Sequence, residues 1–289
     1  MTARQHSARP QARRERRRAP ARSLRLPFGR LLPVGVLALI VVGGGAYLLF
    51  GRQQDGTPLP STAEMASVNR AITHIPADVF DTVGTGDLPN PLKAMTTEQP
   101  LGGADGKAAL LYIGAEYCSY CAPQRWSLIA ALSRFGEFGE LQPTLSARGE
   151  SYPEFPTYTF YRVQYNSPYL NLVALETGDR AKRPLQRISA DQQSLLTLYD
   201  HVGTIPFVDI GNKYYAVGTG YDMNMLRDKS WRDVADGLAD PTNPLTRAIV
   251  GNANYLTAAI CQLTQNQPDS VCGSSAVASV VDKLPARPT

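Results

Sequence analysis

The stretch that most constrains this chain runs from Lys107 to Gly136, KAALLYIGAEYCSYCAPQRWSLIAALSRFG. Residues 108–114 form an apolar run without helical polar spacing, which is typical of a strand covered on both faces of a parallel or mixed sheet. From Cys121 onward the apolar residues recur at helical spacing, and Gly136 is a natural helix terminator. The stretch therefore predicts a buried strand, a turn with two cysteines and a helix, with Cys118 at or near the helix N-terminus.

This placement predicts thiol chemistry. Unpaired backbone N–H groups and the positive end of a helix dipole favour a thiolate over a thiol, so Cys118 is expected to be the acidic, attacking sulfur and to be exposed. Cys121, three residues later, lies within disulfide reach and is expected to be the less exposed, resolving thiol. The pair can then cycle between dithiol and disulfide.

The segment AEYCSYC after an apolar strand resembles the active site of the thioredoxin superfamily. The segment VGTIPFVDIGNKYYAVG, residues 202–218, resembles the one that this family places beside that site. The resemblance implies a thioredoxin-like α/β fold in which Ile205 precedes a cis bond to Pro206, close to the two cysteines. Strands are then expected at 207–210 and 213–217, joined by a tight turn at Gly211-Asn212.

The chain also resembles a family of membrane-anchored thioredoxin-like proteins with a GAEYC-x-YC core and a C-terminal NYLTAAIC segment, a family that brings no assigned substrate. Two features depart from the thioredoxin pattern. Thioredoxins carry a buried carboxylate six residues before the first cysteine, and that position is Tyr112 here. Glu116 is either a substitute for it or a solvated loop acid. In addition, 85 residues separate Cys121 from Pro206, so an insertion at 137–200 is expected.

The rest of the chain predicts further helices and strands. Helices are expected from Ala63 to about Thr73 and from Ser189 to about Tyr199, and an edge strand near Val79–Val83. In the insertion, a core strand is expected at 141–147 and a Tyr/Phe-rich hairpin at 157–164 and 169–176. The aromatic side chains of this hairpin either pack in the core or form a surface that binds a substrate peptide. After the proline segment, we expect a helix over 223–238, a long helix starting at Pro244 and a short one over 274–284.

Charge divides the chain into parts. Residues 1–30 hold ten arginines and one glutamate, and the 20 residues from Leu31 to Phe50 carry no charge, enough to cross about 30 Å of hydrocarbon. By the positive-inside rule we expect an Arg-rich cytoplasmic tail (1–30), an uncleaved transmembrane signal anchor (31–50), a linker (51–62) and a domain outside the cell membrane (63–289). A cleaved signal peptide is the alternative. Residues 53–289 are net acidic, with 18 basic against 24 acidic residues, which argues against a nucleic-acid partner.

Three function classes fit four cysteines in such a domain. The first is an enzyme, a thiol-disulfide oxidoreductase without a cofactor, using Cys118, Cys121 and Pro206 with support from Glu116, Tyr120 and Ile205. The second is a thioredoxin-like binding module with an inert bridge. The third, a zinc module, suits the spacing poorly. Cys261 and Cys272 are expected to form a structural disulfide. The expected partners are protein thiols or disulfides and a membrane redox protein for recycling; the direction of electron flow stays open.

Overall fold

The computed structural model describes residues 57–97, 101–103 and 105–286. These residues belong to the second of two units in the chain, Gly56–Thr289. Within that described part, none of the helices has the length and apolar character needed to cross a membrane. The expected Arg-rich tail and the expected anchor at 31–50 lie outside the described residues, as does the first half of the linker.

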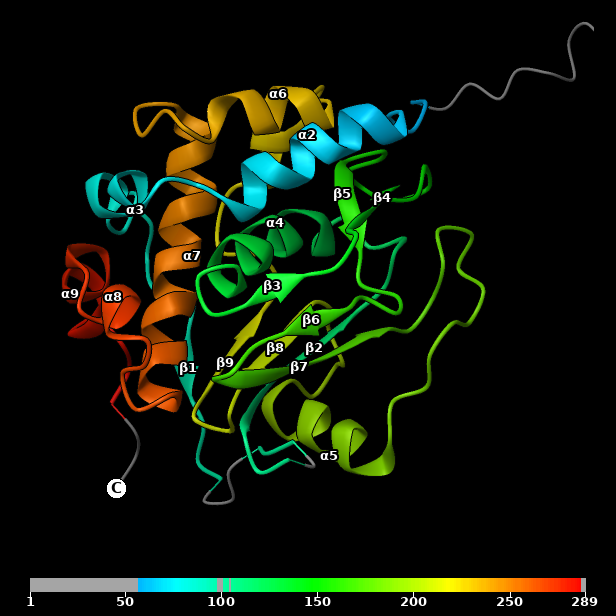
Figure 1. The fold of residues 1–289 in the computed structure, drawn as a ribbon. Helices are drawn as coiled ribbons and strands as arrows, with labels where there is room; N and C mark the ends of the chain where they lie inside the picture. Colours follow the sequence, from blue (N-terminus) through cyan, green and yellow to red (C-terminus); the bar gives the residue numbers. More distant parts are fainter. Residues whose placement is uncertain (1–56, 98–100, 104, 287–289) are drawn as a thin grey trace, which may run out of the picture. The chain divides into compact units, whose positions relative to one another are not determined.

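The framework of the unit is a five-stranded mixed sheet with the strand order β1-β9-β8-β2-β7 (Figure 1). Strand β2 pairs in parallel with β7 and antiparallel with β8, so it lies inside the sheet. The strands are β1 (Lys93–Ala94), β2 (Ala108–Gly114), β7 (Leu170–Glu176), β8 (Phe207–Ile210) and β9 (Tyr214–Val217). The α/β class and the buried strand over 108–114 are confirmed.

Helices cover both faces of this sheet. Leu110 and Tyr112 of β2 pack into the main core with α4 and α7, whereas Leu111 and Ile113 face α5 on the other side (Figure 1). This alternation follows from the two-residue period of a strand. The helices are α2 (Thr62–Thr73), α3 (Ala77–Val83), α4 (Cys121–Leu132), α5 (Ala190–Tyr199), α6 (Trp231–Gly237), α7 (Pro244–Leu263), α8 (Asp269–Cys272) and α9 (Ser275–Val281).

Several expected helices begin at the residues that can cap them. Ser61 accepts a hydrogen bond from Glu64 N at the start of α2, and Ser189 forms a capping box with Gln192 at the start of α5. Asn243 caps α7, whose first residue is Pro244. The turn at Gly211-Asn212 is also present, with both residues at positive φ. Ile210 pairs with Tyr214, so the loop has three residues and the second strand begins one residue later than expected.

The expected edge strand at Val79–Val83 is wrong, because these residues belong to helix α3. Val79, Phe80 and Val83 are buried together, and their spacing fits one face of a helix as well as a short apolar strand. Pro76 stands at the N-cap, a position where a missing N–H costs nothing.

The expected aromatic hairpin is also wrong. Its first half forms β5, which pairs with β4, and its second half forms β7, which pairs in parallel with β2. Arg162, at φ 57°, lies in the turn between them. Residues 137–200 therefore contain a core strand of the main sheet and are not a simple insertion. The smaller strands are β3 (Glu137–Phe138), β4 (Gln142–Leu145), β5 (Pro156–Thr159) and β6 (Tyr165–Asn166).

The strand expected at 141–147 exists as β4 but pairs with β5 outside the main sheet. The helix expected over 223–238 is divided into a 3-10 turn, Met223–Leu226, and α6. Asp228 adopts φ 58° between them, and Ser230 opens α6 with its own capping box to Asp233. The capping residue thus outweighs the apolar spacing that suggested one continuous helix.

Asp209 is a buried carboxylate within β8, and its ionisation should weaken the fold. One oxygen accepts from Asn212 N at 2.7 Å, and the other has no hydrogen-bond partner among the described residues. Burial raises the pKa of Asp209 from 3.8 to about 7. The stability associated with the protonated form is therefore present below pH 3.8 and is lost as the pH rises through about 7.

We expect Asp209→Asn to remove this pH dependence. Relative to the native chain, the variant should gain on the order of 2–3 kcal/mol between about pH 5 and pH 8, because the amide keeps an acceptor for Asn212 N and cannot ionise. Denaturant unfolding at the two pH values measures the difference. An equal effect of the substitution at both values would contradict the raised pKa.

Candidate redox site

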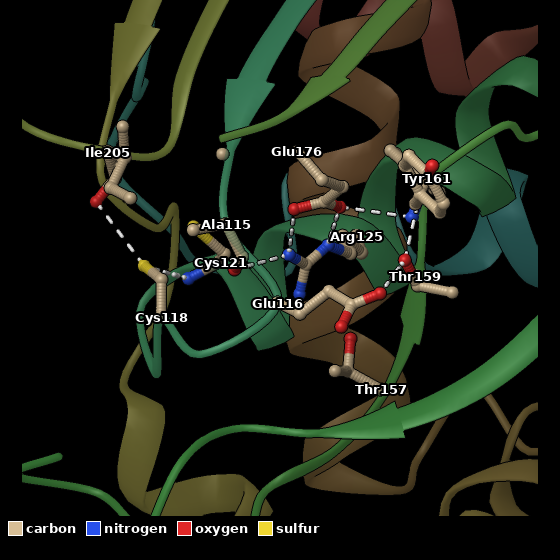
Figure 2. Close-up of polar contacts among 12 residues, drawn as sticks. Ala115, Glu116, Cys118, Cys121, Arg125, Thr157, Thr159, Tyr161, Glu176 and Ile205 are labelled. Atoms are coloured by element: carbon tan, nitrogen blue, oxygen red, sulfur yellow. Dashed lines mark hydrogen bonds and ion pairs between the residues drawn. The ribbon is translucent and has the colours of Figure 1, made fainter. Parts of the chain in front are cut away.

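Cys118 and Cys121 lie where β2 gives way to α4. Cys118 is in the turn after the strand, and Cys121 is the first residue of the helix (Figure 2). The N-cap residue Tyr120 makes no side-chain hydrogen bond, and instead Cys121 N donates to the Cys118 sulfur at 3.1 Å. The Cys118 sulfur therefore accepts one of the free N–H groups at the helix start, where negative charge is favoured. Both cysteines are free thiols in this structure.

The segment around Pro206 lies against this pair. The Ile205-Pro206 bond is cis, as expected. The Cys118 thiol lies 3.6 Å from the Ile205 carbonyl oxygen, which accepts from it (Figure 2). Ile205 also packs on the apolar cluster of Ala115, Cys118 and Cys121. Cys118 and Ile205, 87 positions apart in the sequence, are thus brought to one place by the pairing of β2 with β8.

The two thiols differ in acidity in the expected direction. The hydrogen bond from the Cys121 thiol lowers the pKa of Cys118, and Arg125 and the N–H groups of Tyr120 and Cys121 add to this effect against the opposing effect of burial. Burial raises the pKa of Cys121 well above its ordinary value. The expected exposure of Cys118 is wrong, however: the residue is only 4% exposed, and Cys121 is fully buried. Tyr117 and Ile205 pack against the cluster that the two cysteines form with Ala115.

Beside the cysteines lies an ion pair that the sequence analysis missed. Arg125 donates from Nε to Glu176 Oε1 at 3.0 Å and from Nη2 to Glu176 Oε2 at 2.8 Å (Figure 2). Both side chains are fully buried. Arg125 Nη2 also donates to the Ala115 carbonyl at 2.7 Å, and Phe160 N donates to Glu176 Oε1. Burial raises the pKa of Glu176, and Arg125 opposes that shift.

The position of Arg125 offered a signal that could have found it. It follows Cys121 by four residues, one turn of helix, so the two share a face of α4. Every residue of α4 is buried, and a buried arginine requires an acid. Glu176, the last residue of β7, pairs with Gly114 in the sheet register, and only the parallel pairing of these strands brings it to the site.

The other residues that the sequence singled out differ in their burial and in their distance from the two cysteines. Glu116 is half-buried and accepts from Thr159 Oγ1 at 2.6 Å, so it is held in the structure and is not a freely solvated acid. Tyr120 is 45% exposed beside the cysteines and contacts Tyr152 edge to face. The Tyr112 ring, at the position of the absent carboxylate, lies 5.7 Å from the Arg125 guanidinium. The disulfide between Cys261 and Cys272 is present and joins α7 to α8.

That disulfide uses two of the four cysteines of the chain. In the described part of the chain, no three His, Cys, Asp or Glu side chains are grouped so that they could hold a metal ion.

No curated protein and no solved structure matches this chain. One family model does match, over residues 98–199. The matched span contains both free cysteines together with Arg125 and Glu176, and it ends before Pro206 and the Cys261–Cys272 disulfide. In this span the chain is similar to a family described as a domain of unknown function, DUF929.

Proposed function

We propose that this protein is a thioredoxin-like thiol-disulfide oxidoreductase that acts on protein thiols or disulfides through Cys118 and Cys121. The observation that carries the proposal is the environment of the Cys118 sulfur. It accepts the N–H of the first residue of α4 at 3.1 Å and lies 3.6 Å from the carbonyl oxygen of Ile205, beside the cis bond to Pro206. A sulfur that accepts helix N–H groups is stabilised as a thiolate, which is the nucleophile of disulfide exchange.

The reaction needs only these two sulfurs. When a substrate disulfide is reduced, the Cys118 thiolate attacks one substrate sulfur and releases the other as a thiolate, forming a mixed disulfide. Cys121 then gives up its proton and attacks the Cys118 sulfur, which releases the second substrate thiolate and leaves the oxidised pair. The reverse sequence oxidises substrate thiols. Since the cycle leaves the pair changed, a redox partner must restore it.

A thioredoxin-like binding module with no catalysis is the second candidate, and one observation favours it. Cys118 is only 4% exposed, so little of the residue is open to a substrate sulfur in this structure. Exchange with a dithiol/disulfide buffer separates the two candidates, because a catalytic pair must pass between its two forms and an inert one does not.

We also propose that residues 31–50 anchor the protein in the cell membrane, with the N-terminus in the cytoplasm and the domain outside. The support is the run of 20 uncharged residues after ten arginines and one glutamate. A membrane protein that recycles the pair is then the expected partner.

This topology predicts the behaviour of reporter fusions. Alkaline phosphatase, which folds only where its disulfides form, should be active when fused after Thr62, and a reporter that works only in the cytoplasm should be inactive at the same position. Deleting residues 31–50 should abolish phosphatase activity and serves as the control. A phosphatase fusion that is inactive, with an active cytoplasmic reporter, would contradict the proposed orientation.

A further inference from the structure

We propose that Arg125 is a fixed positive charge that stabilises the reduced, thiolate form of the Cys118–Cys121 pair, and so makes the pair an oxidant of protein thiols. Glu176 is the counter-charge that holds Arg125 in place and limits its effect. The inference rests on the proposed function and assigns it a direction. Both residues are positioning residues, since neither is proposed to touch the substrate.

The first support is the position of the guanidinium. Arg125 follows Cys121 by one turn of α4, and its Nη2 donates to the Ala115 carbonyl oxygen at 2.7 Å. The same carbonyl accepts from Cys118 N at 3.1 Å, so one oxygen joins the arginine to the turn that carries the attacking sulfur. Figure 2 shows the two sulfurs on one side of Ala115 and the guanidinium on the other.

The second support is that Arg125 keeps its positive charge and that its N–H donors are only partly satisfied by hydrogen-bond acceptors. An arginine side chain stays protonated in proteins. Three of the five N–H donors of Arg125 go to Glu176 and Ala115, but Nη1, which is buried, has no hydrogen-bond partner among the described residues. Glu176, by contrast, accepts a further hydrogen bond from Phe160 N at 3.0 Å. The carboxylate is thus better satisfied by hydrogen bonds than the guanidinium.

Other charged groups near the pair are engaged elsewhere. The Glu116 carboxylate accepts from Thr159, and Lys182, 5.1 Å from the Tyr117 ring, forms an ion pair with Glu150 at 2.8 Å. Arg125 therefore supplies the buried positive charge of this site, where exclusion of water strengthens its interaction with a sulfur anion. It acts in the same direction on both thiols: it contributes to the lowered pKa of Cys118 and opposes the rise that burial causes in the pKa of Cys121.

A positive charge that favours the thiolate shifts the redox equilibrium of the pair toward its reduced form. Only the reduced pair carries a thiolate, so a nearby cation stabilises the reduced pair relative to the disulfide. In the oxidising direction, a substrate thiolate attacks the Cys118 sulfur and releases Cys121, which takes up one of the two substrate protons. The second substrate thiolate then attacks the substrate sulfur of the mixed disulfide. Cys118 leaves as the thiolate, and the second proton goes to solvent.

The test is the equilibrium between the oxidised pair and reduced glutathione, measured on the full-length protein in detergent micelles together with the ultraviolet absorbance of the Cys118 thiolate. Arg125→Gln should lower the equilibrium constant about tenfold and raise the pH at which the thiolate forms. Glu176→Gln, which leaves the arginine without its counter-charge, should shift both quantities in the opposite direction. Arg134→Gln, which removes a partly buried arginine just past the other end of α4, is the matched control and should change neither.

A general loss of packing cannot produce opposite shifts, so they would support the inference. Unchanged values, or shifts of the same sign in Arg125→Gln and Glu176→Gln, would overturn it. Should Arg125→Gln fail to fold, the double variant Arg125→Gln/Glu176→Gln leaves no unpaired buried charge and must still lower the constant; an unchanged constant there also overturns the inference. If the native pair exchanges with glutathione but the substitutions leave its equilibrium constant unchanged, this inference alone is overturned. If the native pair does not exchange at all, the proposed function itself is overturned.

Discussion

Cys121→Ser is expected to accumulate disulfide-linked adducts with other proteins through Cys118, and Cys118→Ser is expected to accumulate none. The reason is the asymmetry of the two sulfurs. Cys118 accepts the N–H of Cys121, and its pKa is lowered, whereas Cys121 is fully buried and its pKa is raised. Without Cys121 the mixed disulfide cannot be resolved by the protein itself, so it should persist. Turnover should fall below detection in both variants.

The adducts are detected by non-reducing electrophoresis of membranes from cells that express each variant, after acid quenching of thiols. Cys118→Ser/Cys121→Ser serves as the control, because it retains the Cys261–Cys272 disulfide and reveals any adduct formed through those sulfurs. Equal adduct formation by the two single variants would contradict the assigned roles of attacking and resolving thiol.

Cys261→Ala/Cys272→Ala is expected to destabilise the fold while leaving the redox pair active. The disulfide joins the last turn of α7 to α8 and closes a loop between two residues 11 positions apart in the sequence. A loop of this size contributes on the order of 3 kcal/mol when it is closed by a disulfide, and a loss of that size lowers the melting temperature by roughly 6–12 °C in a domain of this length. Cys261 is also fully buried against the core, so its removal adds a small packing loss.

Thermal unfolding of the native chain and of the double variant, followed by circular dichroism, measures this effect. Residual redox turnover is measured below the melting temperature of the variant. An unchanged melting temperature would contradict the structural role. A folded variant without turnover would show that this second pair relays electrons to the first.

The sequence was most informative where local signals and burial agree. The strand at 108–114 is an uninterrupted apolar run, and the helix after it, the capped starts at Ser61 and Ser189, and the cis bond at Pro206 lie where they were expected. Each of these depends on a few consecutive residues or on a motif whose residues determine the local backbone geometry.

The wrong hairpin and the missed ion pair have a common physical cause, because strand pairing is not encoded in neighbouring residues. Residues 170–176 alternate in the same way whether they form a hairpin or a core strand, and only the parallel pairing with β2 decides between the two. The same pairing places Glu176 beside Arg125, so the missed ion pair and the wrong hairpin are one error. The hydrogen bond from the Cys118 thiol to the Ile205 carbonyl oxygen likewise joins residues 87 positions apart, which the pairing of β2 with β8 brings together.

The central claim is that Cys118 and Cys121 form a pair that cycles between dithiol and disulfide. The most direct measurement is to equilibrate the full-length protein in detergent with buffers of graded reduced and oxidised glutathione. The free thiols are then alkylated, and the modified peptides are identified by mass spectrometry, so that the two pairs of cysteines are read separately. We predict a reversible transition of Cys118 and Cys121 together, with two electrons exchanged, while Cys261 and Cys272 stay bonded over the same range. A Cys118–Cys121 pair that keeps one state across the whole series would contradict the account.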